Sequence, residues 1–319
     1  MGHFWFSPGF EISNPSFPSN EVMLKRLSLL SVLVWQPVTA ELSFKDTAGK
    51  HLDVVSDGKV LVRYMYAYDP STKESLHETY KPYLHVFDAE GKMPITKGAG
   101  GKFTHHRGIF IGWSKIKVAG KSYDRWHMKG GSIIHQKFLQ QEVKDGVATF
   151  TSLTHWMDAE GKPFMSEERT MSVSENQHGG RLMIDFQSKL SPTGEAVYLA
   201  GDPEHAGIQY RPDNEVDKKK TKYLFPNGVT KVNGVKDLPW AAENYTLAGK
   251  NYSVMHLNAK TNPKDTVYSA YRDYGRFGAY FKKEVPKGES LTVNYGFVIK
   301  DGDLPSVEEI DGIWKKWAK

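Results

Sequence analysis

Residues 132–156 read SIIHQKFLQQEVKDGVATFTSLTHW, and this stretch decides the fold. Two runs of strand-forming residues, Ser132–Val143 and Val147–Trp156, stand on either side of Asp145-Gly146. Asp-Gly is favoured in the tight turns that join antiparallel strands, because both residues tolerate a positive φ angle. The stretch therefore predicts a β-hairpin, and by its length the longest in the chain.

A second hairpin is predicted nearer the N-terminus, where Asp57-Gly58 separates His51–Val55 from Val60–Tyr68. Further strand-like segments recur at regular spacing with turn residues between them: Leu42–Lys45, Tyr83–Phe87, Thr170–Ser174, Arg181–Leu190, Val197–Ala200, Ile208–Tyr210, Tyr252–Leu257, Val267–Tyr271, Phe277–Phe281 and Ser290–Ile299. Such spacing is typical of a β-sandwich or barrel. We therefore predict an all-β, antiparallel fold, and the lack of linker-like composition favours one domain over residues 41–319.

One helix is predicted, at the C-terminus. Ser306-Val-Glu-Glu309 is a capping box that directly follows Pro305. Ile310, Ile313, Trp314 and Trp317 then recur at helical spacing on one face. We expect this helix to pack against the sandwich through that face.

The composition excludes several functional classes. Lys and Arg total 42 against 37 Asp and Glu, and this charge of +5 is too small and too dispersed for a nucleic-acid-binding protein. The absence of cysteine excludes disulfides, thiolate zinc sites, iron–sulfur clusters and cysteine nucleophiles. The chain contains no G-x-S-x-G elbow, no G-x-G-x-x-G after a strand and no Walker A loop. We therefore expect no nucleotide cofactor and no nucleic-acid partner.

The N-terminal region has the features of a secretory signal. Basic residues at Lys25-Arg26 precede the apolar run 27–35, and the small residues Val38-Thr39-Ala40 follow it. The apolar run is well short of the ~20 residues that span a bilayer. We expect a signal peptide at residues 23–40, an upstream extension at residues 1–22 that is not native to the protein, and a mature chain exported to the periplasm or the exterior.

The arginines lie in unusual surroundings. Seven of the nine arginines fall between positions 107 and 276, most of them beside His, carboxylate or aromatic residues. The segments concerned are His105-His106-Arg107-Gly108, Asp124-Arg125-Trp126-His127, Glu167-Glu168-Arg169, Gln209-Tyr210-Arg211-Pro212 and Tyr271-Arg272-Asp273-Tyr274-Gly275-Arg276. A guanidinium is a planar fork suited to carboxylates and pairs of hydroxyls. Surface ion pairs would explain the same pattern, but the shared composition favours a binding site.

The histidines and carboxylates supply candidates for proton transfer. If His105 and His106 lie on a strand, they point to opposite faces, and His105 shares its face with Arg107. The loop Gly201–Gly207 places Asp202, Glu204 and His205 together, although Asp202 before Pro203 is also a common turn arrangement. No H-x-H or H-E-x-x-H pattern is present, so a metal site would have to be assembled from distant residues such as His105, His127, His135 and His205.

Together, these segments resemble the PmoA-like family of bacterial domains, whose members are often labelled "methane oxygenase PmoA". The residues that carry the resemblance are Thr104–Gly108, Trp126-His127, Gly131–His135, Glu168-Arg169, His205–Arg211 and Tyr271–Gly275. It covers nearly all of the mature chain. It implies an exported, β-rich protein of bacteria that consume polysaccharides, with His105, His106 and Arg107 marking a site and His205 and Arg211 opposite. From the strand pattern, we further infer that the chain has the twisted antiparallel supersandwich fold of galactose-mutarotase-like proteins.

The leading hypothesis is a carbohydrate-active enzyme of epimerase, lyase or hydrolase type. His105 or His205 would act with Glu204 or Glu168 in proton transfer. The residues expected to bind a sugar or oligosaccharide, which is anionic if the arginines hold a uronate, are His106, Arg107, Trp126, His127, Arg211, Arg272 and Tyr274. Among them, Trp126 would stack on the sugar ring. A non-catalytic glycan-binding module is the alternative, and a metal-dependent oxygenase is the weaker one; the leading hypothesis requires neither a metal nor a cofactor.

Overall fold

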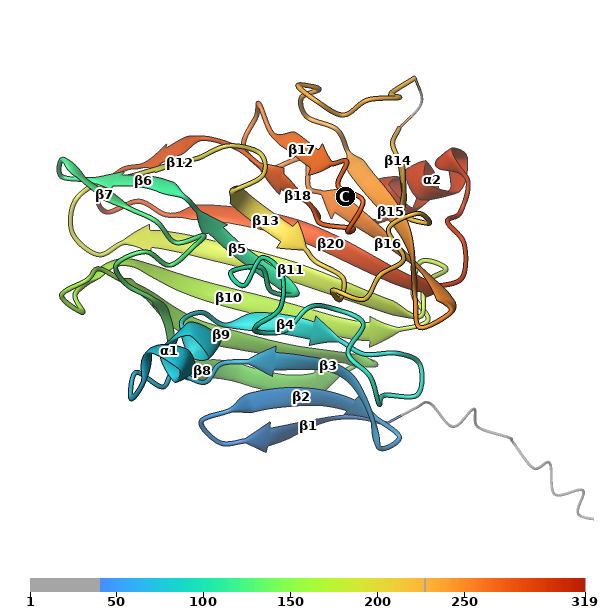
Figure 1. The fold of residues 1–319 in the computed structure, drawn as a ribbon, viewed down its shortest axis with the longest axis horizontal. Helices are drawn as coiled ribbons and strands as arrows, with labels where there is room; N and C mark the ends of the chain where they lie inside the picture. The colour runs from blue at the N-terminus through green and yellow to red at the C-terminus, as the bar shows by residue number, and fades with distance from the viewer. Residues whose placement is uncertain (1–40, 227, 319) are drawn as a thin grey trace, which may run out of the picture. The chain divides into compact units, whose positions relative to one another are not determined.

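Three antiparallel sheets make up most of the fold in the computed structural model, which describes residues 41–226 and 228–318 (Figure 1). The first sheet has the strand order β1 (Leu42–Thr47), β2 (His51–Ser56), β3 (Lys59–Met65), β4 (Tyr83–Val86), β5 (Ile109–Trp113), β13 (Ala206–Tyr210), β18 (Phe277–Tyr280), β17 (Val267–Ala270). The second has the order β14 (Lys222–Leu224), β15 (Trp240–Leu247), β16 (Lys250–Asn258), β20 (Leu291–Asp301), β11 (Leu182–Pro192), β10 (Pro163–Glu175), β9 (Val147–Met157), β8 (Ile133–Lys144).

A smaller third sheet has the order β19 (Lys283–Val285), β12 (Val197–Ala200), β6 (Lys115–Val118), β7 (Lys121–Tyr123). The expected upstream extension (residues 1–22) and signal peptide (residues 23–40) lie outside the described residues. Among the described residues, no helix has both the length and the apolar character required to cross a membrane. The predicted all-β antiparallel fold with a C-terminal helix is confirmed.

The hairpin predicted from residues 132–156 is present as β8 and β9. Lys144 pairs with Val147, and the turn residues Asp145 and Gly146 have φ angles of 50° and 73°. It is not built from the longest strand, however, because the adjacent β10 extends over 13 residues where only Thr170–Ser174 was expected. Glu167 and Arg169 conceal the start of β10 in the sequence, since these buried, charged residues form an ion pair with each other inside the sandwich.

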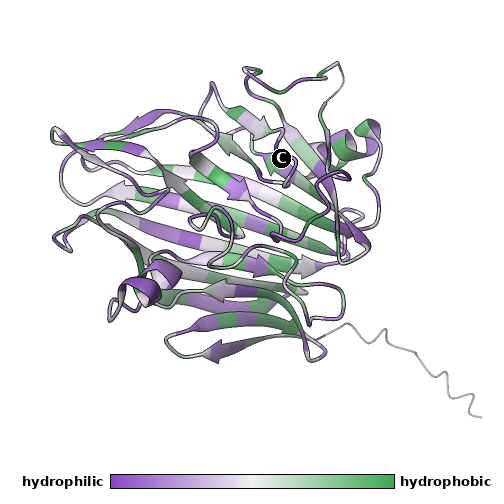
Figure 2. Cartoon of the chain, in the orientation of Figure 1, coloured by the Kyte–Doolittle hydropathy of each residue, from purple (hydrophilic) through white to green (hydrophobic). Residues whose placement is uncertain are grey.

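The two large sheets face each other across the main hydrophobic core. Alternate residues of β20 show how the second sheet separates its two faces: Val293, Tyr295 and Phe297 belong to the core between the sheets, whereas Val298 packs on the outer side. Figure 2 shows hydrophobic and hydrophilic residues alternating along the long strands. This alternation is the two-residue period of a strand with different surroundings on each face.

The C-terminal helix forms as predicted. In α2 (Val307–Trp317), Ser306 Oγ accepts a hydrogen bond from the N–H of Glu309, and Glu309 Oε2 accepts one from the N–H of Ser306. The helix buries Ile310 against the outer face of the second sheet, beside Trp240 and Met255. The helix therefore packs on the sandwich through its apolar face.

A second helix, α1 (Lys73–Thr79), was not predicted. It begins after Thr72, whose Oγ1 accepts a hydrogen bond from the N–H of Ser75. Leu76 is its only large apolar residue, so the helix has no apolar stripe from which a pattern could be recognised.

Candidate functional site

Three loops that are distant in sequence enclose a cavity of about 400 Å³ above the first sheet. They are the loops that enter β5, β13 and β18, and these strands are consecutive neighbours in the sheet. The residues that line the cavity are Phe103, His105, His106, Glu204, His205, Arg272, Tyr274 and Arg276. We call this space the histidine cavity. β5 and β18 both run antiparallel to β13, so the loop before β13 has to reach across the sheet to meet the other two, and side chains up to 173 positions apart come together.

Four imidazole rings form a continuous row at the cavity. The ring centroids of His106 and His105 lie 4.4 Å apart, those of His105 and His127 4.5 Å apart, and those of His127 and His205 5.2 Å apart. These are contact distances between rings. His127 also lines an adjoining cavity of about 460 Å³ that includes Tyr68 and Tyr80. The row thus runs from the buried end of the histidine cavity to more exposed rings.

The two outer histidines are oriented by the same local motif, Asp-x-x-His. Asp124 Oδ2 accepts a hydrogen bond from Nδ1 of His127 at 2.8 Å, and Asp202 Oδ1 accepts one from Nδ1 of His205 at 2.9 Å. Each aspartate also accepts the backbone N–H of its own histidine, at 2.8 Å and 3.1 Å. With Nδ1–H donated to a carboxylate, Nε2 of each ring is left as the proton acceptor.

The repeat of this motif was missed in the sequence, where Asp202 was weighed with Glu204 and His205 for proton transfer or as a turn residue, and Asp124 only as a neighbour of Arg125. The signal that identifies it is the repeated spacing, since Asp124–His127 and Asp202–His205 are both three residues apart. Burial acts to raise the pKa of Asp124, but hydrogen bonds from His127 and the neighbouring backbone outweigh it and lower that pKa. A carboxylate that stays ionised can support a positive charge on its histidine.

His105 and His106 both line the cavity, so the expectation that they point to opposite faces is wrong. The segment is a turn and not a strand: Phe103 has a φ of 53°, and its carbonyl accepts a hydrogen bond from the N–H of His106. Burial lowers the pKa of His105 to about 3 and depresses that of His106 further. Both rings are therefore uncharged at neutral pH, and they can exchange hydrogen bonds with hydroxyl groups.

A carboxylate and a guanidinium pair at the mouth of the cavity. Arg272 Nη2 donates to Glu204 Oε2 at 2.6 Å. Burial acts to raise the pKa of Glu204, but the hydrogen bond from Arg272 and contact with Tyr271 outweigh it, so the pKa is lowered. Glu204 is consequently a carboxylate near neutral pH. The positive charge of Arg272 is therefore balanced by Glu204.

Arg276 is a buried guanidinium in the cavity wall, only 1% exposed. Its side chain donates to Ser269 Oγ. The salt bridges of arginines in the described residues involve Arg63, Arg169, Arg181 and Arg272, and Arg276 is not among them. A buried cation without an ionic partner is costly unless a ligand supplies the negative charge.

Behind this loop lies the buried carboxyl of Glu243. A Cβ on Gly275, which has a φ of 78°, would lie 2.2 Å from Glu243 Oε1, so glycine is required for the loop to approach this closely. Burial raises the pKa of Glu243 well above its usual value, although Arg211 and Arg276 act in the opposite direction. Glu243 and Arg276 form no salt bridge in the described part of the chain, so this guanidinium has no ionic partner there.

Residues 51–315 match a protein family described as a family of unknown function, DUF6807. The chain belongs to the DUF6807 family. The PmoA-like name suggested by the sequence stays a prediction, because the description of the matched family does not include it. No curated protein sequence matches this chain.

Several solved structures resemble this DUF6807 chain in fold at very low sequence identity. A heparinase III is 9% identical over 83% of this chain, with a TM-score of 0.38. The galactose 1-epimerase of Lactobacillus acidophilus NCFM is 7% identical, with 83% of this chain and all of that one covered and a TM-score of 0.38. The Slr1438 protein of Synechocystis sp. PCC 6803 is 12% identical, with 83% and 93% covered and a TM-score of 0.38. The chain spans only 36% of the length of the heparinase III.

Two arginines expected to bind ligand in this DUF6807 chain instead hold the loops together. Arg107 is fully buried and donates to the carbonyl oxygens of Thr104, His106 and His77. Arg211 donates to the carbonyl oxygen of Tyr274 at 2.6 Å and to that of Pro212 at 2.7 Å. Neither lines the histidine cavity. Each fixes a loop that does.

Two further expected residues also lie outside the cavity. Trp126 is 0% exposed and packs against Phe110 with ring centroids 4.9 Å apart, so it is unable to stack on a sugar. Glu168 points outward from β10 and pairs with Lys189 at 3.0 Å. The structure does bring together the other predicted residues: His105, His106, Glu204, His205, Arg272 and Tyr274 line the cavity, and His127 joins the row of rings.

The histidines weighed as metal ligands are only partly brought together. His135 donates or accepts a hydrogen bond with Ser152 Oγ at 2.7 Å and contacts Tyr66, apart from the other three. Within residues 41–226 and 228–318, no group of three or more His, Asp or Glu side chains is placed to hold a metal ion.

Proposed function

We propose that this chain is an exported carbohydrate-active enzyme that binds a sugar acid in the histidine cavity and transfers a proton at that sugar. The observation that carries the proposal is the convergence of His105, His106, Glu204, His205 and Arg276 in one cavity of about 400 Å³. That volume falls within the range of small-molecule sites. Imidazoles, a carboxylate and a guanidinium are together the groups that acid–base chemistry on a hydroxylated acid requires.

The charge of the cavity supports an anionic ligand. Glu204 and Arg272 pair with each other, and the carboxylates of Asp124 and Asp202 lie outside the cavity lining, where they accept hydrogen bonds from His127 and His205. Arg276 is therefore the charged group of the lining that lacks a salt bridge, and it stands beside two uncharged imidazoles. A guanidinium binds a carboxylate through two parallel hydrogen bonds, so a uronate is the sugar that this wall fits best.

The arrangement assigns roles in proton abstraction beside the carboxylate. His205 Nε2, oriented by Asp202, removes the proton from the carbon that bears the carboxylate. The electron pair of that C–H bond moves onto the carboxylate, where Arg276 stabilises the added charge. Delivery of a proton from water to the opposite face gives an epimer, whereas transfer of the proton from His205 to the oxygen that leaves the next carbon gives an unsaturated product. Neither reaction requires an oxidant or a reductant.

Incubation with a panel of uronate oligosaccharides in deuterated water, followed by proton NMR, tests this proposal. We expect deuterium to enter beside the carboxylate, or an unsaturated sugar to form, and His205→Ala to slow this by roughly 10²- to 10⁴-fold. Uronate binding without exchange or product would favour the non-catalytic binding module. Turnover that depends on added copper or iron would favour the oxygenase alternative. No uronate binding at all would exclude the proposed ligand class.

A further inference from the structure

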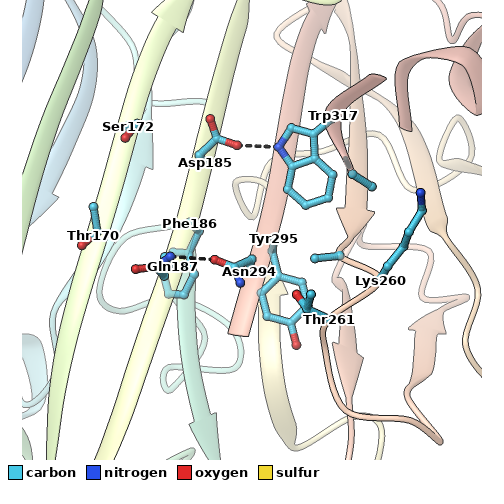
Figure 3. Close-up of a pocket in the computed structure, with 12 residues that line it drawn as sticks. Thr170, Ser172, Asp185, Phe186, Gln187, Lys260, Thr261, Asn294, Tyr295 and Trp317 are labelled. Carbon is cyan, nitrogen blue, oxygen red and sulfur yellow. Dashed lines mark hydrogen bonds between the residues drawn. The ribbon is translucent and has the colours of Figure 1, made fainter. Parts of the chain in front are cut away.

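A second cavity lies on the opposite side of the sandwich, on the outer face of the second sheet. It has a volume of about 590 Å³ and lies between β10, β11 and β20, the segment 259–261 and the end of α2. Figure 3 shows its side chains spread over the strands, with the ring of Trp317 standing at one side. We call it the outer groove. None of its residues belongs to the histidine cavity.

An indole ring forms one wall of the outer groove and is held in a fixed position. Trp317 Nε1 donates to Asp185 Oδ1 at 2.5 Å, the contact drawn in Figure 3. The ring lies over Gly296 of β20, where an added Cβ would be 3.0 Å from Trp317 Cε2. Trp317 is nevertheless only partly buried. A fixed, partly exposed aromatic face is suited to pack against the apolar face of a sugar ring.

The floor of the outer groove is a flat array of side chains that both donate and accept hydrogen bonds. Gln187 Nε2 donates to Asn294 Oδ1 at 2.9 Å across β11 and β20. Thr170 shares a hydrogen bond with Thr151 at 2.8 Å, and Ser172 shares one with Thr149. These pairings fix the side chains while leaving each amide or hydroxyl with unused capacity. Such an array matches the alternating donors and acceptors of sugar hydroxyls.

The charges of the outer groove indicate a neutral ligand. Its lining contains one carboxyl, Asp185, and one ammonium, Lys260, and no guanidinium. Burial raises the pKa of Asp185, although the hydrogen bond from Trp317 acts in the opposite direction. With one group of each sign, no field selects an anion or a cation.

We propose that the outer groove binds a neutral oligosaccharide segment, by stacking on Trp317 and by hydrogen bonds to Gln187 and Asn294. This site goes beyond the proposed activity, since it does not depend on the chemistry of the histidine cavity. It would hold the protein on a neutral glycan while the cavity acts on an acidic sugar.

The test measures binding of cellohexaose, xylohexaose, mannohexaose and a galacturonate hexamer by isothermal titration calorimetry. At least one neutral hexamer should bind the wild-type protein. A double variant, Gln187→Ala with Asn294→Ala, should weaken that binding roughly tenfold or more, because two hydrogen-bonding side chains are lost. Trp317→Phe should weaken it as well, since the ring is no longer fixed by Asp185. His205→Ala should leave it unchanged.

A matched control is available on the same face of the sheet. Ser191 and Ser290 form a hydrogen-bonded pair that does not line the outer groove, so Ser191→Ala with Ser290→Ala should bind as tightly as wild type. Absence of binding to every neutral hexamer, or equal binding by the Gln187/Asn294 variant, would overturn the proposal. A dimer in light scattering that the same variant dissociates would show instead that a second copy covers the groove, and would likewise overturn it.

Discussion

The histidine cavity and the outer groove lie on opposite faces of the same sandwich and use different chemistry. The cavity is built from loops, contains a buried guanidinium without an ionic partner, and holds imidazoles that burial keeps uncharged. The groove is built on strands, contains an indole and a flat amide–hydroxyl array, and has balanced charge. In our proposals, the loops gather groups that react, whereas the strand face offers groups that only bind.

The largest expected effect separates the two Asp-x-x-His motifs. Asp202→Asn should lower kcat on a uronate substrate by roughly 10²-fold, because His205 loses the carboxylate that supports its positive charge. Asp124→Asn should have a smaller effect, since His127 contacts the row of rings but does not line the histidine cavity. Steady-state kinetics with KM unchanged in Asp202→Asn would support this assignment. Equal losses in both variants would contradict it.

The next effect concerns ligand charge. Arg276→Gln should weaken uronate binding by roughly 10- to 100-fold, because a charge-assisted hydrogen bond is lost. It should leave binding of a neutral oligosaccharide in the outer groove unchanged. Calorimetry on both ligands measures this, with Arg63→Gln as the control, since Arg63 is paired with Asp53 on other strands. Uronate affinity equal to wild type would remove Arg276 from the site.

A pH effect on stability is expected from His256, a buried histidine of the core. His256 is fully buried, stacked on Phe297 with ring centroids 4.5 Å apart, and burial lowers its pKa from 6.5 to about 3. Its other ring neighbours are Tyr268, Tyr295 and Phe277, which carry no charge near neutral pH. Between pH 6.5 and about 3, His256 therefore binds a proton in the unfolded chain but not in the folded chain.

Stability present above pH 6.5 is consequently lost as the pH falls toward 3, by up to about 1.4 kcal/mol per pH unit for this group. His256→Phe should make the free energy of unfolding less dependent on pH in that window. Denaturant unfolding of both proteins at several pH values measures the difference. Parallel curves for the two proteins would show that His256 does not contribute.

The smallest expected effect is a loss of stability at the N-terminal cap of α2. The C-terminal end of this helix forms one wall of the outer groove. Ser306→Ala removes the side-chain cap of α2 and should lower the free energy of unfolding by about 1 kcal/mol. Ser306→Asp retains a capping oxygen and should be close to wild type. Neither change should alter kinetics at the histidine cavity. A kinetic effect of Ser306→Ala would indicate that the two sites communicate.

The local patterns of the sequence were sufficient for the fold class, but they missed strands such as β5 and β15 and did not give the site. Asp-Gly turns and the Ser306 capping box are determined by neighbouring residues, so β8, β9 and α2 could be predicted. Glu167 and Arg169 concealed part of β10, because their mutual ion pair makes charged residues tolerable in the core. A local sequence pattern does not show that Glu167 and Arg169 form an ion pair with each other.

The site itself depends on which strands become neighbours. His105, His205 and Arg272 were selected by residue type, and the order β5–β13–β18 brings them together. Arg107, Arg211 and Trp126 were also selected by residue type and lie beside the same loops, but they are buried and support those loops. Arg276 and Arg211 are equally buried, and what distinguishes them is that only Arg276 lines the cavity, which depends on tertiary packing. The repeated Asp-x-x-His spacing was visible in the sequence and was overlooked.

The two faces of strand β20 have different surroundings, with Val293 in the core and Asn294 in the outer groove. Insertion or deletion of a single residue there would exchange these positions, so that an amide enters the core and an apolar side chain enters the groove. Relatives of this chain should therefore vary in β20 by substitution and keep its length. Differences in length are better accommodated at the exposed Asp145-Gly146 turn.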